Sequence, residues 1–257
     1  MLQKSKVDLI KIARLALLLT GVCLLAVSTL YTSSFLAIIG LSILFWSIIL
    51  FYIKPVKHVP LTLLTAVAET NTSNIERILI ELDLTEKGVY LPPKNLQNLE
   101  TSLIFIPKTS KATLPLPQET AEKLYTQQQN GILLTPPGLA LANLFQQELN
   151  NQFTRLSLTE LPNILSKLLV QKLEIVQDAE AEIQGNTINI ILANSLLSDL
   201  CVNASKQPRT HLQVGCILSS AIACVLAQVT GKPIIIQNET QTPETKTTTI
   251  TYQMQEA

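Results

Sequence analysis

The sequence predicts an N-terminal transmembrane α-helical hairpin followed by a cytoplasmic α+β domain with a mostly antiparallel sheet and helices on one face. Three observations lead to this prediction. A charge-free apolar stretch runs from Leu15 to Ile53, short β-prone runs with turn residues between them follow it, and helical patterns are interspersed among those runs. About 200 of the 257 residues lie after the apolar stretch, which is enough for one sizeable core or two small ones.

The apolar stretch has the length of two membrane spans. It contains 39 residues, whereas one helix needs about 20 residues to cross a hydrocarbon core of ~30 Å. The polar sequence Tyr31-Thr32-Ser33-Ser34 interrupts it. We therefore expect spans at about Ile12–Leu30 and Phe35–Ile53. A cleaved signal peptide is the alternative, but the second span and the lack of a small-residue cleavage site before Phe35 favour the hairpin.

Basic residues flank both ends of this hairpin, and the loop between the spans has no charge. Positively charged flanks are typical of the cytoplasmic side of a membrane protein. The sequence therefore predicts a two-span protein of the cell membrane with both termini in the cytoplasm and the lipid bilayer as its partner. The basic residues are Lys4, Lys6, Lys11, Arg14, Lys54 and Lys57.

Charge and cysteine content limit the possible functions further. The chain has 19 basic and 19 acidic residues and no basic stripe away from the membrane, which excludes the electrostatic pattern of a nucleic-acid-binding protein. Cys23 lies in the first span. Cys201, Cys216 and Cys224 leave an odd number in the rest of the chain, which argues against a disulfide framework and for a reducing compartment.

The part after the hairpin divides by composition into two segments. We expect domains at residues 1–57 (the hairpin), 58–117 (juxtamembrane helices and short strands) and 118–257 (the α+β domain). The proline-containing stretch Pro107–Pro117 reads as the connector between the last two. In the middle segment the patterns predict a helix over Leu61–Glu69, a second helix capped by Ser73 or Asn74 and ending near Asp83, and strands over Gly88–Leu91 and Thr101–Ile106.

The last segment alternates strand and helix signals. A capping box at Ser157–Glu160 predicts a helix as far as Leu173, Gly185-Asn186 predicts a tight hairpin, and Gly231 predicts the end of a small-residue helix. The expected elements are a strand over Gly131–Leu134, a helix over Leu139–Leu149, strands within Glu174–Gln184 and Thr187–Ala193, a helix from Cys216 to Val229, and a hairpin of Pro233–Gln237 with Lys246–Gln253.

Two resemblances follow from these motifs. With its two spans, Phe105-Ile106-Pro107 and the segment Gly131–Gly138, the whole chain resembles a group of uncharacterised archaeal membrane proteins. Residues 118–257 resemble the 4-vinyl-reductase domain, which is related in fold to the TRAPP tethering subunits, and Gly215-Cys216 to Gly231 carries most of this resemblance. That resemblance implies binding of a small molecule or metal near cysteines before the helix and in the final hairpin. Only Cys216 corresponds here, because Thr240–Thr249 has no cysteine.

The candidate metal ligands are Cys201, His211, Cys216 and Cys224. Zinc takes four ligands, usually with closely spaced cysteine pairs, and these spacings are not of that kind. The alternative is that Cys224 is a small buried hydrophobe and that His211 is an exposed loop residue. A Cys216–His211 nucleophile pair is a further alternative. We expect no catalytic residues, no metal and no cofactor.

Two further patterns have plain structural explanations. Asp178, Glu180 and Glu182 alternate along an expected strand and suit a solvated sheet face, with a weak divalent-cation site as the alternative. The small residues of the helix from Cys216 to Val229 suit core packing or a homodimer face. The function expected is a non-enzymatic, membrane-anchored module for protein interaction or self-assembly. The alternative is a small-molecule-binding sensor with a pocket like that of the 4-vinyl-reductase domain.

Overall fold

A computed structural model of the chain describes residues 2–31, 33–52, 61–93, 102–109, 125–126, 130–149, 157–242 and 246–255. The chain divides into two compact units, Met1–Val59 and Pro60–Ala257. The boundary after the hairpin lies close to the predicted one at residue 57.

The first unit is a helical hairpin, α1 (Leu2–Leu30) and α2 (Ser34–Tyr52), with its break at the predicted polar sequence. Two glycines allow the helices to pack closely, because a Cβ at Gly21 would lie 2.8 Å from Leu44 Cγ and one at Gly40 would lie 3.1 Å from Leu25 N. The hairpin is thus present, and its insertion in a membrane stays a prediction.

Among the described helical segments, Pro208–Thr230 is long and apolar enough to cross a membrane. Most of this segment is buried inside the second unit, as expected for a core helix. The apolar parts of the hairpin, Leu15–Leu30 and Ser34–Leu50, are shorter.

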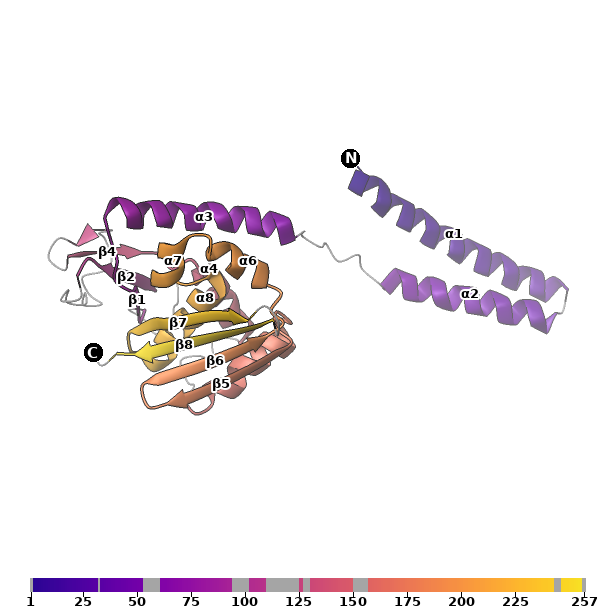
Figure 1. The fold of residues 1–257 in the computed structure, drawn as a ribbon. Helices are drawn as coiled ribbons and strands as arrows, with labels where there is room; N and C mark the ends of the chain where they lie inside the picture. The colour runs from indigo at the N-terminus through magenta and orange to yellow at the C-terminus, as the bar shows by residue number, and fades with distance from the viewer. Residues whose placement is uncertain are drawn as a thin grey trace. The chain divides into compact units, whose positions relative to one another are not determined.

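The second unit is an α+β fold around one antiparallel sheet. Among the described residues the sheet has eight strands in the order β3-β4-β2-β1-β7-β8-β6-β5 (Figure 1). Its strands are β1 (Val89–Leu91), β2 (Leu103–Pro107), β3 (Tyr125–Thr126), β4 (Gly131–Leu134), β5 (Asp178–Gln184), β6 (Thr187–Ala193), β7 (Ile234–Thr242) and β8 (Thr247–Met254).

This strand order corrects the predicted division at residue 117. Both β1 and β2 lie inside the sheet, between β4 and β7, where β1 pairs with β7 through Val89–Ile235 and Tyr90–Ile234. Residues on either side of the expected boundary therefore share one sheet and one core. Most of the expected connector Pro107–Pro117 lies outside the described residues.

The predictions for the second unit are confirmed for some helices and turns and wrong for others. The helices are α3 (Leu61–Glu81), α4 (Leu139–Glu148), α5 (Leu161–Ser166) with the π-helix Lys167–Lys172, α6 (Ser198–Ala204), α7 (Pro208–Gln213) and α8 (Ile217–Thr230). The hairpin predicted at Gly185-Asn186 is confirmed, because β5 and β6 pair on either side of it. The predicted helix end at Gly231 is also confirmed: Gly231 is the C-cap of α8 and has φ 64°.

Two predicted helix boundaries are wrong. Helix α3 is continuous, without a cap at Ser73 or Asn74, and the Thr72 hydroxyl inside it lies within 3.2 Å of the Ala68 carbonyl oxygen, the kind of bond that satisfies a hydroxyl without ending a helix. The helix expected from Ser157 begins only at Leu161.

The main core lies between the helices and one face of the sheet. Alternation along β8 buries Thr248, Ile250, Tyr252 and Met254 and leaves the residues between them half-exposed. Ile250, Tyr252 and Met254 belong to the same core as most of α8. Because α8 is buried on almost every side, its start is a place where polar groups must find partners inside the fold.

Candidate functional site

Two cysteines meet where α6 reaches the start of α8. Cys201, in α6, is 3% exposed, and Cys216, the N-cap residue of α8, is 1% exposed. Their Cα atoms are 5.1 Å apart and the two residues are paired as a disulfide. The odd cysteine count argued against a disulfide framework, whereas the structure pairs two of these three cysteines and leaves Cys224 free.

A glycine brings the chain into this corner. Gly215 has φ 79°, in the left-handed region that favours glycine. A Cβ there would lie 2.6 Å from Ser219 Oγ and 2.7 Å from Ile236 Cδ1. The following residue, Cys216, is extended and its Sγ accepts the N–H of Ser219 at 3.5 Å. Gly215 thus turns the chain, and Cys216 caps the start of α8 directly after it.

An acidic side chain from β7 completes the cluster. Glu239 Oε2 accepts the N–H of Cys216 at 3.2 Å and lies 2.6 Å from the hydroxyl of Ser219. A carboxylate is stabilised at this position because the first N–H groups of a helix carry partial positive charge. Its other oxygen, Oε1, is buried and has no hydrogen-bond partner among the described residues.

The three side chains form a compact set of potential ligands. The sulfur atoms of Cys201 and Cys216 and a carboxylate oxygen of Glu239 all lie within 4.8 Å of one another. We refer to these three residues as the cysteine–glutamate cluster. Two thiolates and one carboxylate are ligands that a zinc-like divalent cation accepts, with one position left for water or substrate.

Two buried tyrosines hold the backbone beside the cluster. The Tyr252 hydroxyl donates to the Ser219 carbonyl oxygen at 3.0 Å, and the Tyr90 hydroxyl donates to the Val214 carbonyl oxygen at 2.5 Å. Burial raises the pKa of both phenols well above the usual value, and the nearby charge of Glu239 adds to the effect. Both rings therefore act as neutral donors that fix the segment preceding α8 and its first turn.

The structure separates the four candidate metal ligands, for which the sequence analysis expected no metal. Cys201 and Cys216 come together, whereas Cys224 lies farther along α8 in the core, where burial raises the pKa of its thiol. His211 lies outside the cluster. It was expected in an exposed loop but lies in α7 and is half-buried, with Nδ1 lacking a partner among the described residues.

Sequence reasoning missed Glu239. It lies 23 residues after Cys216, in a strand that was expected to end at Gln237, and no spacing motif links the two. A register shift in β7 occurs between Ile236 and Asn238, just before Glu239. The position of its carboxylate depends on this irregular pairing, which a sequence pattern does not reveal.

The three acidic residues of β5 form no comparable site. Asp178, Glu180 and Glu182 are all exposed on one face of the strand, as the alternation predicted. The Glu182 carboxylate accepts the side-chain amide of Gln184 at 2.8 Å. The prediction of a solvated sheet face is confirmed.

Comparison with known proteins identifies the family. The domain of unknown function DUF7982 matches residues 4–254, so the chain belongs to that family. No curated protein matches the chain. No solved structure matches it either.

Proposed function

We propose that the protein is a membrane-anchored, thiol-based sensor. In this proposal the first unit holds the chain in the cell membrane, and the second unit responds to a thiophilic metal ion or to oxidants at the cysteine–glutamate cluster. The single observation that carries the proposal is that two cysteines and an acid with an unpartnered oxygen lie within 4.8 Å of one another.

The surface of the hairpin supports the membrane anchor. Large apolar side chains are exposed on both helices, including Leu19 at 55%, Phe35 at 73%, Trp46 at 61% and Ile48 at 61%. Water does not favour so many exposed apolar groups, and lipid does. The basic flanking residues support a cytoplasmic location of the second unit.

The cluster suits two exclusive states. In the reduced state, two thiols lose their protons and bind one divalent cation together with Glu239, with release of two protons. In the oxidised state the sulfur atoms share a bond and cannot bind the metal in this way. Disulfides in a reducing compartment are usually transient and serve catalysis or redox sensing, which agrees with a switch at this position.

The proposed resemblance to the 4-vinyl-reductase domain agrees with this assignment. The domains implied by that resemblance carry ligands before the helix and in the final hairpin. Here Cys216 stands before α8 and Glu239 stands in β7, the first strand of that hairpin. The role in protein interaction or self-assembly, with a homodimer or another protein as partner, stays a prediction, as does the absence of catalysis.

Zinc binding by the full chain in detergent tests the proposal. Tris(2-carboxyethyl)phosphine opens the disulfide to two thiols, and with water it becomes the phosphine oxide. We then expect one zinc ion per chain in competition with a chromophoric chelator. Cys216→Ser should lose this binding, and Cys224→Ser should keep it because Cys224 lies outside the cluster.

The control separates ligand loss from unfolding. Both substitutions replace a buried sulfur with a hydroxyl, at the N-cap of α8 for Cys216, where serine is a favoured residue, and inside the buried helix for Cys224. Circular dichroism must show a folded chain in each case. Equal zinc binding by wild type and Cys216→Ser, or no binding by folded, reduced wild type, would refute the metal site.

A further inference from the structure

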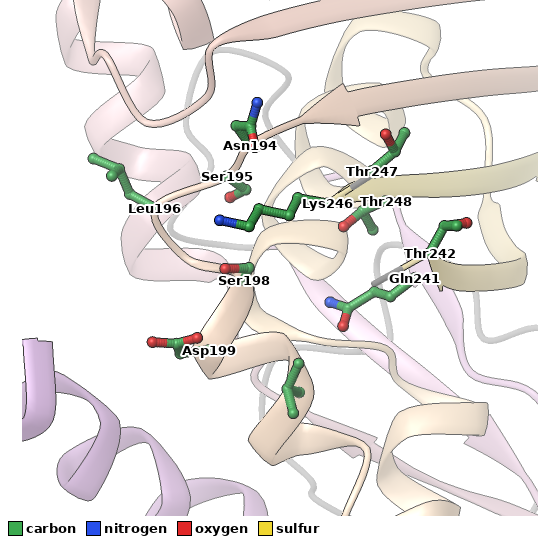
Figure 2. Close-up of a pocket in the computed structure, with 11 residues that line it drawn as sticks. Asn194, Ser195, Leu196, Ser198, Asp199, Gln241, Thr242, Lys246, Thr247 and Thr248 are labelled. Carbon is green, nitrogen blue, oxygen red and sulfur yellow. The ribbon is translucent and has the colours of Figure 1, made fainter. Parts of the chain in front are cut away.

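A pocket of about 420 Å³ lies next to α6, apart from the cysteine–glutamate cluster (Figure 2). Pockets for small molecules have volumes of about 300–1,000 Å³. Its walls come from the segment after β6, the beginning of α6 and the facing ends of β7 and β8. The lining residues used below are Asn194, Ser195, Ser198, Asp199, Gln241 and Lys246.

Hydrogen bonds build the frame of this pocket in advance. The N–H of Asn194 donates to the carbonyl oxygen of Lys246 at 2.9 Å, which joins the two walls. The Asn194 side-chain amide donates to Gln177 Oε1 at 2.6 Å, and Ser195 Oγ accepts the N–H of Leu197 at 3.1 Å. These hydrogen bonds occupy polar groups of Asn194 and Ser195, so a ligand would meet the polar groups of other lining residues.

Two residues of the frame have an unusual backbone. Asn194 and Lys246 both have φ 49°, in the left-handed region that non-glycine residues seldom adopt. Such conformations persist where the surrounding structure determines them, and they cluster at binding sites. The hydrogen bond between these two residues holds both in place.

The pocket lining combines the Lys246 ammonium and the Gln241 amide with several hydroxyl groups, two apolar side chains and the Asp199 carboxylate. Gln241 Nε2 is buried and has no partner among the described residues, although an amide N–H of this kind needs an acceptor. Figure 2 shows the Lys246 side chain extended toward Ser195 and Ser198. Lys246 forms no ion pair among the described residues. An ammonium group and an orphan amide donor suit an anionic oxygen acceptor.

Asp199 has a different explanation. It lies in the first turn of α6, where an acidic side chain stabilises the helix N-terminus. Asp199 also lines the pocket, but it forms no ion pair with Lys246 among the described residues. Its carboxylate therefore leaves the Lys246 ammonium without a direct ion-pair partner in the described part of the chain.

We infer that this pocket binds a small molecule through a carboxylate or phosphate group, which accepts hydrogen bonds from Lys246 and Gln241. This inference is independent of the metal site, because the cluster residues do not line the pocket. Carboxylate and phosphate are both anionic hydrogen-bond acceptors, and the experiment below shows which of them the pocket binds.

Calorimetric titration of the full chain in detergent tests the inference with inorganic phosphate and with succinate, and with uncharged succinamide as the control probe. We expect saturable binding of phosphate or succinate and none of succinamide. Lys246→Gln should weaken binding about tenfold or more, since a hydrogen bond to a charged group contributes about 1.5–3 kcal/mol. Gln241→Leu should weaken it in the same direction.

Lys206→Gln is the matched control, because Lys206 is also an exposed lysine and does not line the pocket. It should bind the preferred probe as the wild type does. Failure of both phosphate and succinate to bind, or equal weakening by Lys206→Gln and Lys246→Gln, would overturn the inference. Cys216→Ser should bind the probe normally, so that a failed metal site and a failed pocket are distinguished.

Discussion

Replacement of Glu239 by glutamine should destabilise the second unit by roughly 2–3 kcal/mol. The carboxylate lies within hydrogen-bond distance of the N–H of Cys216, at 3.2 Å, and the hydroxyl of Ser219, at 2.6 Å. A hydrogen bond to a charged group contributes about 1.5–3 kcal/mol and a neutral one about 0.5–1.5 kcal/mol, so each bond weakens by roughly 1 kcal/mol. Loss of the charge at the start of α8 removes about 0.3–1 kcal/mol more.

Urea unfolding of the fragment Pro60–Ala257 measures this change. Glutamine has the shape of glutamate, so a large loss reports the charge and not a cavity. Glu180→Gln is the control, because Glu180 is exposed on β5 and its substitution should change the free energy of unfolding by less than about 0.5 kcal/mol. If Glu239→Gln is as stable as this control, the carboxylate does not hold the start of α8 and the reasoning is wrong.

Three further predictions concern the fold and its pH dependence. Gly138→Ala should lower the free energy of unfolding by about 3 kcal/mol or more, because its Cβ would lie 2.1 Å from a backbone nitrogen of α8. Gly185→Ala should lower it by about 1–2 kcal/mol, because the site has open space but a φ of 58°; urea unfolding compares the two variants. Stability should fall above about pH 8.5–10, because the unfolded chain releases the protons of Cys224 and Tyr252 there while burial keeps them bound in the fold; Cys224→Ala should flatten the first part of that fall in a pH series of thermal unfolding. A reporter active only in the cytoplasm and fused after Ala257 should be active, and activity of an extracytoplasmic reporter there would reverse the proposed orientation.

Local signals predicted much of the secondary structure. The polar break after Leu30 ends α1, Gly185 turns the β5–β6 hairpin, and Gly231 ends α8, as expected from their chemistry. Each of these features depends on a few neighbouring residues. Helix α3 shows the limit, because Ser73 and Asn74 have the chemistry of caps and yet lie inside a continuous helix.

Long-range pairing explains what the sequence could not reveal. No local pattern indicates that β1 pairs with β7, and this pairing joins the segments that composition had divided. The same applies to the cluster. Cys201 and Cys216 were candidates from the sequence alone. Glu239, the acidic residue that lies beside them, comes from a strand with a register shift. The sequence analysis named both cysteines as candidate ligands while expecting no metal, and it did not name Glu239.

X-ray absorption at the zinc edge tests the central claim most directly. The full chain is reduced, loaded with one equivalent of zinc in detergent, and compared with Cys201→Ser. We predict two sulfur neighbours at about 2.3 Å, with oxygen or nitrogen neighbours at about 2.0–2.2 Å completing the coordination. The variant should lose at least one sulfur neighbour. A zinc site without sulfur, or an unchanged spectrum in Cys201→Ser, would contradict the proposal that the cysteine–glutamate cluster is the sensor site.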